Sequence, residues 1–171
     1  MFFKRLVVIT GLVCAAVLLF AGCSKQPAEV PKAVAAEAAL LAEEAKFAMS
    51  IRENTRAEEL MERALKLRAD RPEYWVTLGM ALRKQDKKDA ARKAYNKALA
   101  LHVARYKADQ KPEELAEQAF VLGLLGKTDD ALKLLQKGLE DHSDSDHMKR
   151  MADPRGLPRT FQTADFKALA L

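Results

Sequence analysis

Apolar residues along most of this chain recur at intervals of three and four positions and do not alternate with polar ones. This spacing places them on one face of a helix. Between Lys32 and Leu139 the strong helix formers Ala, Leu, Glu, Lys and Arg dominate, and glycine and proline are few. No alternating segment is longer than a few residues, so the pattern predicts an all-α fold.

The first residues follow a different pattern. Lys4 and Arg5 precede a nearly uninterrupted apolar run over residues 6–20, and the small residues Ala21 and Gly22 follow it. The run is shorter than the roughly 20 residues that span a bilayer. A basic start, a short apolar middle and small residues at the end are typical of a secretory signal peptide, here residues 1–22.

The stretch Phe20-Ala21-Gly22-Cys23 resembles the lipobox of bacterial lipoproteins. The resemblance implies cleavage before Cys23, a diacylglyceryl group on its sulfur and acylation of the new amine, with palmitate as a typical chain. One position departs from the family, which prefers Leu where this chain has Phe20, although Leu19 keeps the site apolar. The alternatives are an uncleaved membrane anchor and an ordinary signal peptide.

Residues 23–32 form the lipidated cysteine and a linker, in which Pro27 and Pro31 favour an extended chain. Such a linker reaches up to about 30 Å from the lipid surface. Cys14 would be removed with the signal peptide and Cys23 would be lipidated, so the mature chain has no pair of thiols for a disulfide. Its core alone must stabilise it.

A set of apolar and small residues occurs twice with identical gaps, 40 residues apart. The first set is Pro72, Trp75, Leu78, Gly79, Leu82, Ala91, Tyr95, Ala98 and Leu99; the second is Pro112, Leu115, Gln118, Ala119, Leu122, Ala131, Leu135, Gly138 and Leu139. Part of a third copy, Ala57, Met61 and Ala64, lies 34 residues before Ala91, Tyr95 and Ala98. A repeated period of this length indicates stacked structural repeats.

The elements Trp75-x2-Leu78-Gly79 and Ala91-x3-Tyr95-x2-Ala98 resemble the tetratricopeptide repeat. The resemblance implies antiparallel helix pairs stacked as a short solenoid over residues 33–145. Six extra residues, 106–111, depart from the period and predict a longer helix there. The first repeat, near 38–71, matches only in its second helix, as terminal repeats often do. The alternative is a plain helical bundle with chance spacing.

In this family the first helices of the repeats line a concave groove that receives a peptide or a helix. Matching the motif position by position assigns the groove to Val76, Met80, Arg83, Lys84, Ala116, Phe120 and Leu124. Val76 and Met80 stand where the family's sites for C-terminal carboxylates have Lys and Asn, so that kind of ligand is not expected. Met and Phe suit adaptable recognition of an apolar protein segment.

Residues 146–171 are predicted to form a C-terminal capping segment or tail. Ser143 or Ser145 suits a helix cap after the last repeat, and Thr163 is a good N-cap for a final short helix. Two alternatives stay open: Phe161 and Phe166 fill the groove and make it core, or the tail serves interactions with other molecules.

The chain contains no nucleophile elbow and no glycine-rich phosphate loop, so no enzyme activity and no cofactor are expected. Asp144, Asp146 and His147 form the one cluster with metal-ligand chemistry, but the glycine and distal glutamate of a calcium loop are missing. A polar turn without metal is therefore the preferred interpretation. The net charge of +5 is spread in alternating signs, which gives no reason to expect nucleic acid as a partner.

Together these features predict a non-catalytic, lipid-anchored adaptor that holds a protein partner at the periplasmic side of a bacterial membrane, in envelope, pilus or outer-membrane assembly. Ser24 directly after Cys23 favours the outer over the inner membrane. The alternative is a ligand- or metal-binding periplasmic lipoprotein. Trp75 is expected to pack as core against Met61 and Leu65, so that its loss would cost about 3–5 kcal/mol.

Overall fold

The computed structural model describes residues 30–171, which are helices joined by short turns, with no strand among them. The predicted signal peptide, Cys23 and the linker up to residue 29 lie outside the described residues. The all-α prediction is confirmed, and none of the helices in residues 30–171 is both long and apolar enough to cross a membrane. The helices are α2 (Lys32–Ser50), α3 (Asn54–Leu67), α4 (Pro72–Lys84), α5 (Lys88–Asp109), α6 (Pro112–Leu124), α7 (Thr128–Asp141), α8 (Asp146–Ala152), α9 (Leu157–Thr160) and α10 (Ala164–Leu169).

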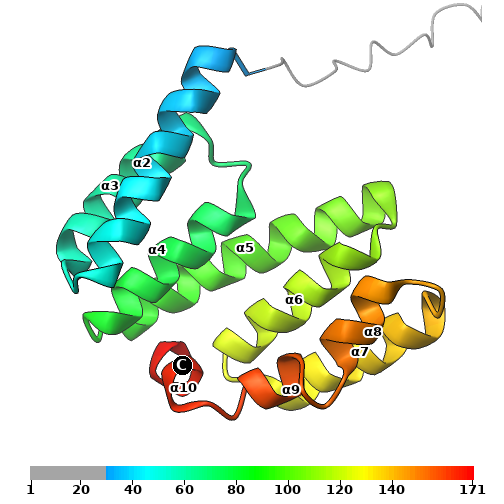
Figure 1. Cartoon of the computed structure of the whole chain (residues 1–171). Coiled ribbons are helices and arrows are strands. Elements are labelled where there is room, and N and C mark those ends of the chain that lie inside the picture. The colour runs from blue at the N-terminus through cyan, green and yellow to red at the C-terminus, as the bar shows by residue number, and fades with distance from the viewer. Residues whose placement is uncertain (1–29) are drawn as a thin grey trace, which may run out of the picture. The chain divides into compact units, whose positions relative to one another are not determined.

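The first six helices form three pairs, α2 with α3, α4 with α5 and α6 with α7 (Figure 1). Successive pairs join through the second helix of one and the first helix of the next, α3 on α4 and α5 on α6. This is the stack of antiparallel helix pairs that the resemblance to the tetratricopeptide repeat implies. A helix pair cannot bury both of its apolar faces alone, so neighbouring pairs supply the missing cover.

The turn inside each pair has the same backbone conformation. One residue is left-handed in each turn, and the N–H after it bonds to a carbonyl five residues back, a helix-ending arrangement. The left-handed residues are Arg52 (φ 65°), Asp86 (φ 58°) and Gly126 (φ 75°), and the bonds are Glu53 to Ala48 (2.9 Å), Lys87 to Leu82 (3.0 Å) and Lys127 to Leu122 (2.9 Å). The left-handed residues lie 34 and 40 positions apart, the same offsets as the repeated residues of the sequence. The first helix pair therefore has the same turn, at the same place, as the other two pairs.

The core repeats in the same register. On the second helix of each pair, one position holds a small buried residue, and the position four residues later holds a large buried one. The small residues are Ala57, Ala91 and Ala131, and the large residues are Met61, Tyr95 and Leu135. The closest approach is in the second pair, where a Cβ added to Gly79 would lie 2.3 Å from the Tyr95 ring. No other residue type fits at 79 without moving a buried ring, because protein interiors are close-packed.

Two local predictions had different outcomes. The extra residues before Pro112 lengthen α5, as predicted, and the helix ends at the left-handed Gln110 (φ 52°). Trp75, in contrast, is half-buried and not a core residue. Its indole N–H donates to the Ala69 carbonyl at 2.9 Å, and its ring lines an open cavity with Leu65 between α3 and α4. The indole needs a polar partner, and the exposed turn between α3 and α4 offers one, which keeps the ring at the surface.

The C-terminal segment caps the stack. The Ser145 and Thr163 side chains accept hydrogen bonds from the N–H groups of Met148 (3.2 Å) and Phe166 (3.3 Å), so both predicted caps are present. Helix α8 packs on α6 and α7, with the Met148 side chain fully buried. Helix α10 returns to α4 and α6, so the end of the chain lies against the middle of the stack (Figure 1).

The partial exposure of Trp75 changes its expected contribution to stability. We expect Trp75→Ala to lower the free energy of unfolding by about 1–2 kcal/mol, whereas Met61→Ala, at a fully buried site, should cost about 2–5 kcal/mol. Urea unfolding of both variants measures the difference. A larger loss for Trp75→Ala than for Met61→Ala would contradict the core described above.

Candidate partner groove

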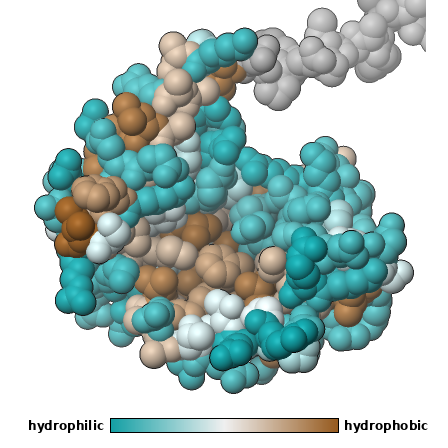
Figure 2. All heavy atoms as spheres, in the orientation of Figure 1, coloured by the Kyte–Doolittle hydropathy of each residue, from teal (hydrophilic) through white to brown (hydrophobic). Residues whose placement is uncertain are grey.

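The apolar surface of interest lies on the first helices of the second and third pairs, α4 and α6. Figure 2 shows apolar atoms gathered in a hollow in the middle of the molecule, with hydrophilic atoms along much of its rim. Met80 and Phe120 are half-buried apolar residues on these helices. Partly exposed large apolar side chains in a hollow form a surface that another chain can cover.

The chain's own tail covers part of this surface. The buried Phe161 and Phe166 rings lie 5.1 Å apart, and Phe166 meets the Phe120 ring edge-on at 5.6 Å. Gly123 makes room for them, because a Cβ there would lie 2.7 Å from the Phe161 ring. The sequence left open whether the tail fills the groove, and on the α6 side it does.

Hydrogen bonds to the last three residues hold the tail in place. Arg83 donates to the Ala170 carbonyl (2.7 Å), the Tyr95 hydroxyl donates to the Leu169 carbonyl (2.9 Å), and the Leu171 N–H donates to the Leu124 carbonyl (2.9 Å). Burial raises the pKa of Tyr95, so its hydroxyl stays protonated and remains a donor. Each of these bonds joins the tail to α4, α5 or α6.

The seven residues that the sequence assigns to the groove have unequal exposure. Val76, Ala116 and Leu124 are buried, Met80, Arg83 and Phe120 are half-buried, and Lys84 is exposed. The structure brings Arg83, Phe120 and Leu124 into contact with the tail. Met80 and Lys84 therefore remain the groove residues most available to a partner.

The sequence interpretation missed Gly123 and Tyr95 as residues of this site. Gly123 follows the assigned Phe120 by three positions, so it lies on the same face of α6, and its lack of a side chain was the available signal. Tyr95 was predicted only as a motif residue of the repeat, and its ring is buried in the core. Its hydroxyl donates to the backbone carbonyl of Leu169 in the tail. Every residue has such a carbonyl, so the sequence could not indicate this contact.

The buried polar residues between α5 and α6 have a structural role. The His102 Nδ1 lies 2.6 Å from the Glu114 carboxylate, and the Gln118 amide donates to the His102 carbonyl at 3.4 Å. Arg105 lies 3.9 Å from the same carboxylate. Buried polar groups require such partners, and these contacts join the second pair to the third.

The turn over residues 141–147 does not assemble a metal site. Among residues 30–171 no three or more His, Cys, Asp or Glu side chains gather as metal ligands do. Asp144 and Asp146 are exposed, and Asp146 lies 3.6 Å from the Lys149 ammonium. Ser145 caps α8, so the turn has the geometry of a helix start.

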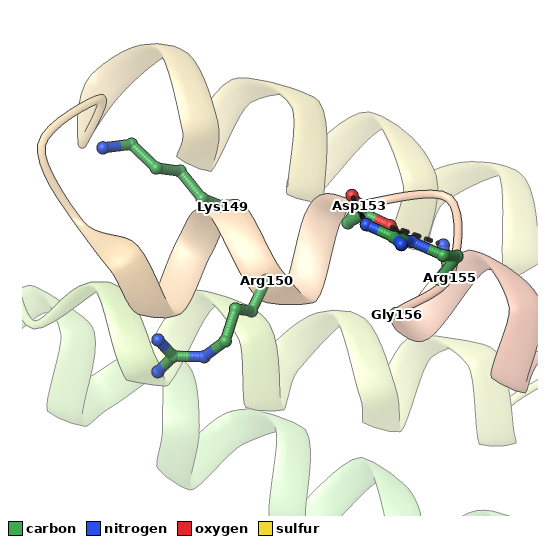
Figure 3. A pocket seen from close by; sticks show the side chains of 5 residues that line it. All are labelled: Lys149, Arg150, Asp153, Arg155 and Gly156. Carbon is green, nitrogen blue, oxygen red and sulfur yellow. Dashed lines mark hydrogen bonds and ion pairs between the residues drawn. The ribbon is translucent and has the colours of Figure 1, made fainter.

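A shallow cavity of about 380 Å³ beside α8 is lined by several basic residues. Figure 3 shows that Lys149 and Arg150 point away from each other, while Arg155 lies against Asp153. That pair is 3.0 Å apart, and the hydrogen bond from Arg155 lowers the pKa of Asp153. Because the cations do not converge on a common point, the cavity lacks the geometry of a phosphate or carboxylate site.

Comparison with known protein families identifies a repeat family. The model of the tetratricopeptide repeat matches residues 72–102, which cover α4 and most of α5. The chain therefore carries a tetratricopeptide repeat, and its flanking helix pairs share the turn and core register of that repeat. Such repeats generally act as non-catalytic scaffolds that bind protein partners. No curated protein shows a significant match to the chain.

The docked tail makes a specific contribution to stability. We expect Phe166→Ala to lower the free energy of unfolding by about 3 kcal/mol, because it removes a buried ring from between Phe120 and Phe161. Urea unfolding measures the loss, and faster proteolysis within residues 153–171 reports release of the tail. Lys167→Ala, at an exposed position of the same helix, is the matched control. Equal effects of the two changes would contradict the docking.

Proposed function

We propose that the chain is a non-catalytic, lipid-anchored adaptor that holds a protein partner at the periplasmic side of a bacterial membrane. The observation that carries the proposal is the tetratricopeptide repeat over residues 72–102 with a partly open apolar surface on its first helix. The outer membrane is the proposed location, and envelope, pilus or outer-membrane assembly the proposed setting.

The chemistry of the groove favours a protein segment as its occupant. Met80 offers a flexible apolar side chain, and Lys84 places a positive charge at the edge of the same helix. A peptide or helix with an apolar residue for Met80 and an acidic residue for Lys84 matches both features. The tail occupies the neighbouring α6 side, so the partner contacts α4 beside it.

The lipid anchor rests on the sequence around Cys23. A diacylglyceryl group adds two acyl chains, and each buried methylene contributes about 0.8 kcal/mol to membrane binding, so two chains hold stably. Pro27 and Pro31 favour an extended linker between the anchor and α2. A groove held within the reach of this linker suits capture of a partner that is itself at the membrane.

Replacing Cys23 with Ala tests the anchor. We expect the variant to lose labelling by radioactive palmitate and to move from the membrane fraction to the soluble fraction, or to accumulate as the uncleaved precursor. Cys14→Ala is the matched control, because that residue lies within the predicted signal peptide and should not change labelling. A Cys23→Ala protein that is still processed and palmitate-labelled would refute the anchor.

The groove is tested with a photo-crosslinking residue at position 80, compared with one at Lys93, an exposed residue of α5. We expect crosslinks to a protein of the envelope from position 80 and a yield several-fold lower from position 93. Met80→Ala should weaken binding of the protein so identified while lowering the free energy of unfolding by only about 1 kcal/mol, because the side chain is half-buried. Equal yields from positions 80 and 93 would count against the groove.

A further inference from the structure

Among the large apolar residues of the described chain, those with the highest exposed fraction lie on the outward face of α2 and at its end. Leu40 and Phe47, together with Ile51 directly after the helix, are 62%, 63% and 48% exposed. At about 100° per residue they fall within roughly 40° of one another around the helix axis, on the side opposite the face of α2 that packs on α3. Figure 2 shows apolar atoms along the edge of the molecule that α2 occupies in Figure 1.

The register of the repeats shows what such a face normally contacts. The equivalent positions 34 and 74 residues further along are buried or half-buried. They are Tyr74, Ala81 and Gln85 on α4 and at its end, and Glu114, Val121 and Leu125 on α6 and at its end. The helices that pack on α4 and α6 from the preceding pair are α3 and α5. The three apolar residues of α2 therefore occupy a face that receives an antiparallel helix elsewhere in this chain, while no described helix precedes α2.

We propose that this face of α2 is a docking surface for an amphipathic helix of a partner protein that carries Lys or Arg beside its apolar stripe. The surface is separate from the groove on α4, and the inference requires neither the groove nor the lipid anchor. The apolar half of the proposal follows from Leu40, Phe47 and Ile51, whose side chains no residue in 30–171 covers. An apolar stripe of this width on a helix fits one partner helix.

The charge of the partner follows from the residues beside the stripe. Glu37, Glu43 and Glu44 are all exposed, and Lys46, the basic residue between Leu40 and Ile51, lies 2.7 Å from Glu43. Arg52 follows Ile51 at the end of the stripe, which leaves more acidic than basic side chains along it. The remaining negative charge attracts a basic helix and repels an acidic one. The contact between α5 and α6 shows the same pairing of charges, because Arg105 on α5 lies 3.9 Å from Glu114 on the equivalent face of α6.

A second copy of this chain fits the surface less well. Helix α7 is the next helix in the series α3, α5, α7, but α8 already packs on it, so a second copy cannot offer α7 without losing α8. Packing one α2 against another would bring Glu43 and Glu44 of both copies together. Like charges placed opposite each other are destabilising, so a basic partner helix is favoured.

The chain supplies its own probe for the test. A synthetic peptide of residues 88–109 has the sequence of α5, the helix that covers the equivalent face of α6, and carries six Lys and Arg against two Asp. We expect this peptide to bind the purified full-length protein saturably by fluorescence anisotropy, in a mild detergent. Phe47→Asp should weaken binding at least about tenfold, as loss of a central anchor does. Glu44→Lys should weaken it about threefold and reduce its dependence on salt.

Controls separate this surface from the others. Leu132→Asp changes a partly exposed apolar residue of α7 and should leave peptide binding unchanged. Met80→Ala should also leave it unchanged; if Met80→Ala abolishes binding and Phe47→Asp does not, the peptide uses the groove and the inference fails while the proposed function stands. Absence of saturable binding to the unaltered protein overturns the inference. Light scattering that shows a dimer abolished by Phe47→Asp also overturns it, because the occupant is then a second copy.

Discussion

The close approach of α4 and α5 at Gly79 is the contact on which most of this structure depends. A Cβ at that position would lie 2.3 Å from the Tyr95 ring, so the spacing of the two helices is set by a missing side chain. The fully buried ring in turn fixes the Tyr95 hydroxyl, which meets the Leu169 carbonyl of the tail at 2.9 Å. One small residue thus determines the spacing of the central pair and the place where the end of the chain docks.

The elements of the fold were predictable where they depend on side-chain size and spacing. The offsets of 34 and 40 residues located α4 to α7, and the caps at Ser145 and Thr163 followed from their position before helix-forming segments. The first pair was predicted less well, because its shared feature is a left-handed backbone at Arg52, a residue type that gives no such signal. Only the structure shows that this pair has the same turn.

The candidate site was predictable in its location but not in its occupancy. The motif placed Met80 and Phe120 on the correct helices, yet no sequence pattern showed that the tail reaches Phe120. Phe161 and Phe166 made docking of the tail one of two open alternatives, but two of the bonds that hold the tail go to its backbone carbonyls, which any residue provides. Trp75 was misjudged for a related reason: its indole N–H finds the Ala69 carbonyl in the exposed turn after α3, and any residue there would provide that acceptor.

The return of the tail also changes how the stack should unfold. In a linear array of repeats each unit contacts only its neighbours, so opening can begin at either end and proceed one unit at a time. Here the bonds from Arg83 and Tyr95 to residues 169–170 join segments more than 70 positions apart. The four helices α4, α5, α6 and α7 therefore form one cooperative block with the tail. Among residues 30–171 the pair α2–α3 has a neighbouring pair on one side, at α4, and it lies outside that block. Amide hydrogens of α2 should therefore exchange through local opening, while those of α5 exchange only when the whole block opens.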